Sequence, residues 1–252
     1  AQAKLLEREK LERDLQLAQE VQQRMLPQTL PQLGGWAFGA RMLPARHVAG
    51  DFFDFIPCGD NTVAIVVADV CGKGMGSALH MSLTRGLLRA ELNRAASPLE
   101  ALRNVNRHLL DVNDAGLFVT VGCAIVERDS RAVTYYRAGH ELPIVVEKAG
   151  ETYTPARGLG HPLGLIPDPS IDIQHMTLPP GGRLFLYTDG FTEAQDAEGR
   201  FFGATRLHDV VGAMAANTPQ ELCERLIKHL LAFQNGAPQS DDLTVVAIQL
   251  VA

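Results

Sequence analysis

The chain has 252 residues, of which 46% are hydrophobic, and a formal net charge of −6. No block of like charge marks a nucleic-acid-binding arm, and no apolar run approaches the roughly 18 residues that cross a bilayer. Because the N-terminus also lacks the apolar core of a secretory signal, we expect a cytoplasmic protein with no membrane segment in this sequence and no nucleic-acid partner.

The first predicted element is a helix over residues 3–26, which contain neither Gly nor Pro. One face of this helix carries residues at spacings of four and three, of which all but Gln22 are apolar: Leu11, Leu15, Ala18, Gln22 and Met25. Two interpretations stay open, namely a coiled coil that pairs two copies and an amphipathic helix packed on its own domain. The segment PQTLPQLGG ends the helix, so we divide the chain into a linker helix at 1–26 and a domain at 27–252.

From Trp36 onwards, short apolar runs broken by turns predict strands, with helices arriving in pairs. The expected strands are 36–43, 50–57, 62–68, 118–127, 131–139, 143–148, 171–178, 183–188 and 243–250. The expected helices are 76–95, a helix opened by Ser97, Pro98 and Glu100, then 203–216 and 219–233, the last opened by Thr218, Pro219 and Glu221. A regular alternation of strand and helix is absent, which favours an α+β fold built on antiparallel sheet.

Residues 155–170 contain several Gly and Pro residues and separate two of the predicted strands. Four of their side chains are too apolar for free solvent: Leu159, Leu163, Leu165 and Ile166. We therefore expect an ordered loop there rather than a linker.

Single aspartates stand at the ends of the apolar strands. Asp69 ends the run TVAIVVA, Asp189 ends RLFLYT, Asp241 precedes LTVVAIQL, and Asp51 follows Ala49 and Gly50. Each of them could also be an ordinary turn former or helix cap. If they converge, their mutual repulsion and loss of hydration require a hard divalent cation. Oxygen ligands without nearby His or Cys select Mg²⁺ or Mn²⁺ over zinc, and the Val70 carbonyl could complete such a shell.

Seven segments resemble the PPM-type (type 2C) metal-dependent Ser/Thr phosphatases, in their bacterial SpoIIE/RsbU-like branch. They are LAQEVQQRMLP, PARHVAGDFFDF, ADVCGKGMGSALHMS, RAGHELPIVV, GHPLGLIPD, LFLYTDGFTEAQDAEGRFFGATRL and SDDLTVVAIQL. The resemblance implies a β-sandwich of two antiparallel sheets flanked by helix pairs, with two Mn²⁺ or Mg²⁺ ions at one end.

The resemblance also implies roles for individual residues. Asp69 would bridge both ions with help from the Val70 carbonyl, Asp189 and Asp241 would hold one ion, and Asp51 the other. A water activated by both ions would then attack the phosphorus of phosphoserine or phosphothreonine. The sequence departs from relatives that carry a histidine, proposed as general acid, where Cys71 stands.

For partners, the resemblance implies a phosphorylated anti-sigma-factor antagonist as substrate in a partner-switching pathway. It also implies an upstream sensor or receiver domain joined through the linker helix, and a homodimer formed by that helix. Two alternatives remain. One is a catalytically silent phosphatase-like module that binds a partner; the other is a nucleotide cyclase, suggested by AGDFFDF. The cyclase reading leaves Asp189 and Asp241 unexplained and finds Phe52 where that family has an acid.

Overall fold

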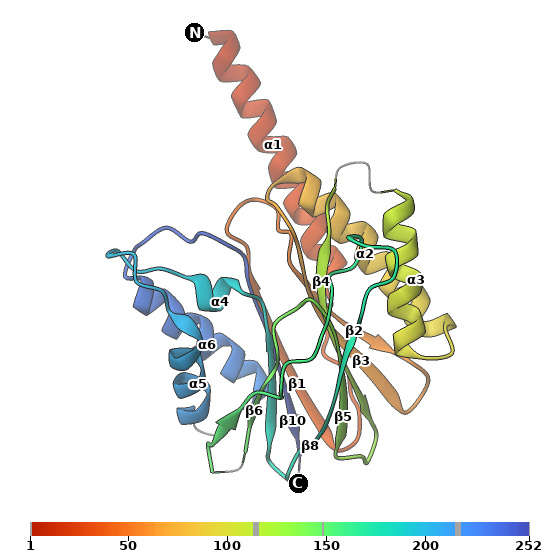
Figure 1. The fold of residues 1–252 in the computed structure, drawn as a ribbon. Coiled ribbons are helices and arrows are strands. Elements are labelled where there is room, and N and C mark those ends of the chain that lie inside the picture. Colours follow the sequence, from red (N-terminus) through yellow and green to blue (C-terminus); the bar gives the residue numbers. More distant parts are fainter. Residues whose placement is uncertain (1, 113–115, 148, 215–217, 252) are drawn as a thin grey trace.

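The computed structural model describes residues 2–112, 116–147, 149–214 and 218–251. Two five-stranded antiparallel sheets lie face to face, with helices on both outer faces (Figure 1). The first sheet has the order β1 (Trp36–Leu43), β10 (Leu243–Leu250), β9 (Arg183–Tyr187), β6 (Ile144–Val146), β7 (Thr152–Tyr153). The second has the order β2 (Phe52–Pro57), β3 (Thr62–Val70), β4 (Val119–Glu127), β5 (Ala132–Ala138), β8 (Asp172–Thr177). The predicted α+β sandwich is confirmed.

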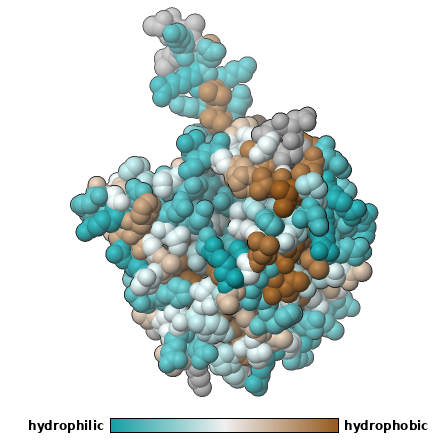
Figure 2. Space-filling model, viewed as in Figure 1, coloured by the Kyte–Doolittle hydropathy of each residue, from teal (hydrophilic) through white to brown (hydrophobic). Residues whose placement is uncertain are grey.

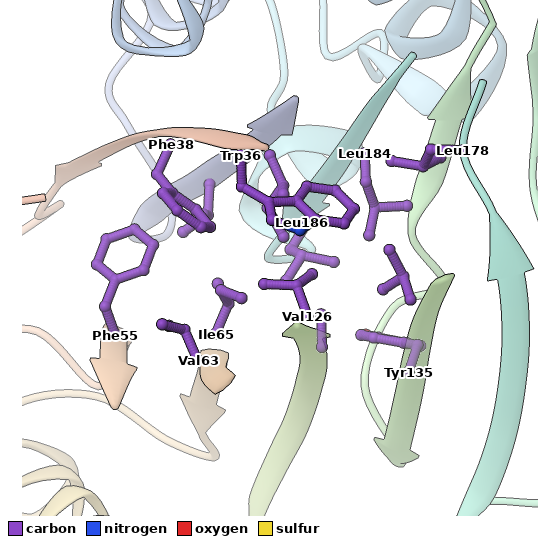
Figure 3. Packing of buried hydrophobic residues seen from close by; sticks show 14 of the residues in the cluster. Trp36, Phe38, Phe55, Val63, Ile65, Val126, Tyr135, Leu178, Leu184 and Leu186 are labelled. Atoms are coloured by element: carbon purple, nitrogen blue, oxygen red, sulfur yellow. The ribbon is translucent and has the colours of Figure 1, made fainter. Parts of the chain in front are cut away.

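The core between the sheets is built from alternate residues of each strand. In β2, Phe53 and Phe55 point towards the partner sheet, whereas Phe52 and Ile56 join the cluster under the helices. Figure 3 shows the inner layer, in which the aromatic rings of Trp36, Phe38 and Phe55 meet the aliphatic side chains of the facing strands. Both faces of the central strands are therefore covered, which explains their continuous apolar sequences.

One helix pair covers each sheet. The pair α2 (Met75–Arg94) and α3 (Pro98–Asp111) packs on the second sheet, and α5 (Gly203–Ala213) and α6 (Pro219–Gln234) pack on the first. The predicted capping box at Thr218 and Glu221 is present in full. At α3 the Ser97 side chain accepts from the Glu100 amide, but the Glu100 carboxylate accepts from the amide of Ala96 instead of Ser97.

Helix α1 (Gln2–Met25) projects from the body, and only its C-terminal half contacts the domain (Figure 1). Leu11 is exposed, whereas Gln22 is buried and Met25 accepts a hydrogen bond from Ser82 of α2. The packed-helix interpretation thus holds for the C-terminal half, and the coiled coil stays a prediction for the rest. No helix among the described residues carries an apolar stretch sufficient for a bilayer crossing.

The structure corrects several local expectations. Leu159 and Leu165 are 67% and 49% exposed, so they do not anchor their loop as predicted; Leu163, which is fully buried, does. The short helix α4 (Gly190–Glu193) and strand β7 were not expected. Helix α5 ends at Ala213, three residues before the predicted end, and the last two predicted positions lie outside the described residues, as does residue 148 of the strand expected at 143–148.

Candidate metal centre

Antiparallel pairing brings the four predicted aspartates to one end of the sandwich. Phe52 pairs with Ala68, so Asp51, just before β2, lies opposite Asp69, near the end of β3. In the other sheet Val245 pairs with Tyr187, so the start of β10 lies beside the end of β9. The segments that carry Asp51, Asp69, Asp189 and Asp241 therefore meet at the same edge.

Two threonine hydroxyls donate hydrogen bonds to the carboxylate of Asp51. Its side chain is 2% exposed, and its Oδ2 accepts from Thr188 Oγ1 at 2.7 Å and from Thr244 Oγ1 at 2.8 Å. Both threonines are fully buried. These two bonds fix the orientation of the Asp51 carboxylate.

Asp69 and Asp51 form a hydrogen-bonded pair of carboxyl groups. Burial, followed by repulsion from Asp189 and more weakly from Asp241, raises the pKa of Asp69 to about 7, against the opposing effect of that hydrogen bond. Burial, with the charges of Asp69 and Asp242, also raises the pKa of Asp51 well above its usual range. A proton shared between the two groups is thus favoured in the metal-free protein.

Asp189 lies between β9 and helix α4, and its environment is strongly acidic. Burial, then the charges of Glu193, Asp241 and Glu141, raise its pKa to about 6. The following residue, Gly190, packs against β10 so closely that an added Cβ would lie 2.0 Å from the Asp242 carbonyl oxygen. Only glycine lets Asp189 approach the start of β10 at this point.

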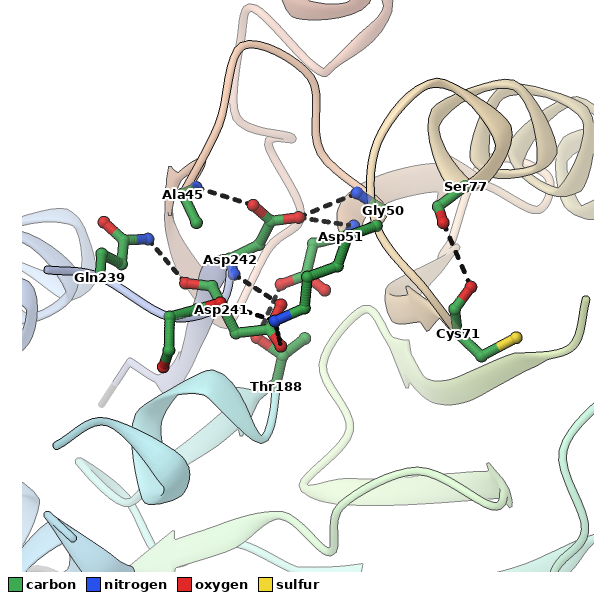
Figure 4. Close-up of polar contacts among 11 residues, drawn as sticks. Ala45, Gly50, Asp51, Cys71, Ser77, Thr188, Gln239, Asp241 and Asp242 are labelled. Atoms are coloured by element: carbon green, nitrogen blue, oxygen red, sulfur yellow. Dashed lines mark hydrogen bonds and ion pairs between the residues drawn. The ribbon is translucent and has the colours of Figure 1, made fainter. Parts of the chain in front are cut away.

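The two neighbouring aspartates at the start of β10 have different contacts (Figure 4). Asp242 accepts from the amides of Ala45 at 2.8 Å and Gly50 at 2.9 Å, and so fastens the loop that precedes Asp51. Asp241 instead points to the turn after β3, where its Oδ2 lies 2.8 Å from Lys73 Nζ. Asp242 therefore anchors the loop before Asp51, whereas Asp241 faces the Lys73 ammonium.

The loop before Asp51 is also fastened by α1 and by the end of β3. Gln22 donates to the Ala49 carbonyl and accepts from the Ala49 amide, both at 2.9 Å. A Cβ on Gly50 would lie 3.0 Å from the Val70 carbonyl oxygen. The small residues Ala49 and Gly50 therefore leave room for the Val70 carbonyl, which the sequence suggested as a metal ligand.

The carboxylates fit a hard cation in their chemistry. Within the described ranges, no three His, Cys, Asp or Glu side chains are already set around one point as metal ligands. The raised pKa values of Asp69 and Asp189 mean that ionisation of these groups destabilises the fold as pH rises from about 4 through 7. A divalent ion would remove that cost, and the donors on offer are oxygen atoms, as Mg²⁺ and Mn²⁺ prefer.

Cys71 and His140 make structural contacts. The Cys71 sulfur accepts from the Phe118 amide at 3.1 Å and points away from the aspartates in Figure 4. His140 is buried, shares a 2.8 Å hydrogen bond with Thr120, and has its pKa lowered to about 3, chiefly by burial. It is therefore a neutral, hydrogen-bonded residue.

Sequence reasoning did not select Thr188, Thr244, Asp242 and Lys73. The two threonines do carry a signal, since each is a polar residue in an otherwise apolar strand and lies within two residues of an aspartate. Their contacts with Asp51 span 137 and 193 residues, so no local pattern reveals them. Lys73 stands between two glycines in CGKGMGS.

Comparison with protein families gives a match over residues 59–251 to the model described as Stage II sporulation protein E (SpoIIE). Among curated proteins, the chain is 30% identical to Protein IcfG of Synechocystis sp. over 93% of the chain and 41% of that protein. It is 27% identical to Phosphoserine phosphatase RsbU of Bacillus subtilis over 96% of the chain and 71% of that protein. The chain thus spans about two fifths of the first relative's length and most of the second's.

Among solved structures, the fold matches the SiaA-PP2C domain of Pseudomonas aeruginosa with a TM-score of 0.84. The match covers 96% of this chain and 98% of that domain at 24% sequence identity. At this identity the likeness establishes the fold, and it includes nearly every element described above.

Proposed function

Since the chain belongs to the SpoIIE family, we propose that it is a metal-dependent phosphoserine/phosphothreonine protein phosphatase. One observation carries the proposal: four aspartates from distant parts of the chain meet at one end of the sandwich, where Asp51, Asp69 and Asp189 have strongly raised pKa values. Similarity to the phosphoserine phosphatase RsbU supports the reaction type.

We assign the metal-binding role to Asp51, Asp69, Asp189, Asp241 and the carbonyl of Val70. Two Mn²⁺ or Mg²⁺ ions bound there would lower the pKa of a water and neutralise phosphate charge. RsbX, a solved structure with the same fold (TM-score 0.64, 18% identity), is described as a complex with magnesium. Thr188 and Thr244 would keep Asp51 aimed at the site, and Asp242 would hold the loop that carries it.

For the substrate, we propose a phosphorylated anti-sigma-factor antagonist in a partner-switching pathway, in the cytoplasm. The support is similarity to RsbU and to a solved protein described as the RsbU and RsbW domains of Rv1364c. A silent binding module is disfavoured because every proposed carboxylate is present. A nucleotide cyclase is disfavoured because Asp54, the second acid of AGDFFDF, is fully buried and paired with Arg85 and Arg89 of α2.

Phosphate release from a phosphoserine protein tests the function directly. We expect turnover with Mn²⁺, none in EDTA, and recovery when Mn²⁺ is added back, because the carboxylates cannot activate water without a cation. The same preparation is incubated with GTP as a control for cyclase activity. Mn²⁺ binding without phosphate release would favour the silent module, equal turnover in EDTA would contradict the metal mechanism, and a cyclic nucleotide product would favour the cyclase.

We further propose that residues 1–26 link the phosphatase domain at 27–252 to an upstream sensor or receiver domain, and that α1 forms a homodimer. A groove of about 350 Å³ lies between α1 and α2 and is lined in part by Leu17, Val21, Met75 and Leu79. All four side chains are at least 42% exposed, an unusual cluster for a surface that stays in water. The projecting half of α1 is largely hydrophilic on the face seen in Figure 2, so pairing would centre on the groove.

Sedimentation of the chain with and without residues 1–25 tests the dimer. We expect the full chain to dimerise and the truncated chain to be monomeric. Leu17→Ser with Leu79→Ser is the matched variant, because it removes the apolar contacts and keeps the helix. A full chain that stays monomeric at high concentration would contradict the proposal.

A further inference from the structure

Lys73 is bound to the aspartate that faces the turn after β3. Its Nζ lies 2.8 Å from Asp241 Oδ2 and donates to the Ser240 carbonyl at 2.6 Å. These two contacts place the ammonium on the segment that leads into β10. Lys73 therefore already supplies a positive charge to one member of the proposed metal centre.

Two glycines flank Lys73 in the turn between β3 and α2. Gly72 and Gly74, on either side, have φ angles of 86° and 91°, in the left-handed region that favours glycine. No side chain lies within 4 Å of where a Cβ on Gly74 would stand. Lys73 thus extends a long side chain from an exposed turn between the end of β3 and the start of α2.

The space beside Lys73 does not hold an additional hydrated ion. A cavity bordered by Lys73, Asp241 and Asp242 has a volume of about 10 Å³. This is room for one water at most. While the ammonium stays on Asp241, a divalent ion with its remaining water ligands does not fit on the same carboxylate from this side.

We propose that Lys73 is the resident cation of Asp241, and that a divalent ion binds Asp241 by displacing the Lys73 ammonium. This rests on the proposed function in taking Asp241 as a metal ligand. In the metal-free protein, Lys73 offsets the negative charge on Asp241. Lys73 is thereby a competitor that weakens metal binding and a partner that stabilises the empty site.

The expected effect is moderate, because the Lys73 and Asp241 side chains are 42% and 35% exposed. For an ion pair with such exposure, Lys73→Gln should tighten Mn²⁺ binding by roughly three- to tenfold. The same change should lower the melting temperature in EDTA and leave it nearly unchanged at saturating Mn²⁺. A merely structural lysine would lower both melting temperatures alike.

The test is calorimetric titration of the full chain with Mn²⁺, alongside thermal melts in EDTA and in saturating Mn²⁺. Arg46→Gln is the matched control, because Arg46 borders the same small cavity and its removal changes the local charge equally. Equal tightening in both variants would show a general charge effect and overturn the proposal. Unchanged or weaker binding in Lys73→Gln would also overturn it, while a wild-type chain that binds no Mn²⁺ would overturn the metal centre itself.

Discussion

Asp69→Asn is expected to lower phosphate release on the order of 10³-fold or more, the largest effect of any single change we foresee. Asparagine keeps the shape of the side chain but removes the charge that is proposed to be shared by both ions. In the structure Asp69 is the carboxylate that interacts with Asp51, Asp189 and Asp241 together. Its replacement therefore disturbs the interactions with all three other carboxylates at once.

The stability of Asp69→Asn separates this loss from misfolding. The folded pKa of Asp69 is about 7, above its unfolded value, so its ionisation destabilises the metal-free fold as pH rises from about 4 through 7. Asparagine resembles the protonated form. In EDTA at pH 8 the variant should therefore be more stable than the wild type, by about 1–3 kcal/mol in the free energy of unfolding.

Thermal and denaturant melts at pH 5 and pH 8 check this, and Asp209→Asn on the exposed side of α5 is the matched control. The control should keep both turnover and stability. An Asp69→Asn protein that turns over substrate at a near-normal rate would contradict the assignment of Asp69. A variant less stable than the wild type at pH 8 would contradict the electrostatic account.

Gly190→Ala is expected to destabilise the fold by about 2–4 kcal/mol and to abolish most of the turnover. The added Cβ would lie 2.0 Å from the Asp242 carbonyl oxygen and 3.1 Å from its carbonyl carbon. Both are backbone atoms of Asp242, the residue just before β10, so they cannot move aside as the end of a flexible side chain could. Relief requires α4 and β10 to separate, which would move Asp189 away from Asp241.

Gly86→Ala is the matched control for Gly190→Ala. No atom lies within 4 Å of a Cβ built on Gly86, which is inside helix α2. Alanine there should raise stability by about 0.5–1 kcal/mol through helix propensity. Denaturant unfolding of both variants, with Mn²⁺ titration, checks the pair. A Gly190→Ala protein with wild-type stability and metal affinity would show that the close approach of α4 and β10 is not required.

Local features of this fold could be predicted from sequence because their causes are local. The Thr218–Glu221 capping box and the apolar run of β3 each depend on residues a few positions apart, and both were identified. The loop at 155–170 was understood only in part. Its content of leucine did not reveal that Leu159 faces solvent while Leu163 is buried and pairs with Val119.

The site was predictable at the level of strand ends but not of contacts. An aspartate after an apolar run marks the end of a buried strand, and this pattern identified Asp69 and Asp189. The contact of Thr244 with Asp51 and that of Lys73 with Asp241 depend on strand order and on pairing between residues far apart in sequence. These contacts form only when the two sheets are assembled, so the spacing of residues within one segment does not predict them.

The two hydrogen bonds between Gln22 and Ala49 connect helix α1 directly to the loop that leads to Asp51. A helix turns by about 100° per residue, so rotation by a single position would carry the Gln22 amide away from the loop that leads to Asp51. For any module joined ahead of α1, rotation of the helix would therefore be transmitted to the loop that leads to Asp51. Chimeric proteins that join another module to α1 should therefore preserve the rotational position of the helix. Inserted residues should add whole helical turns, because the length of the insertion alone does not ensure this.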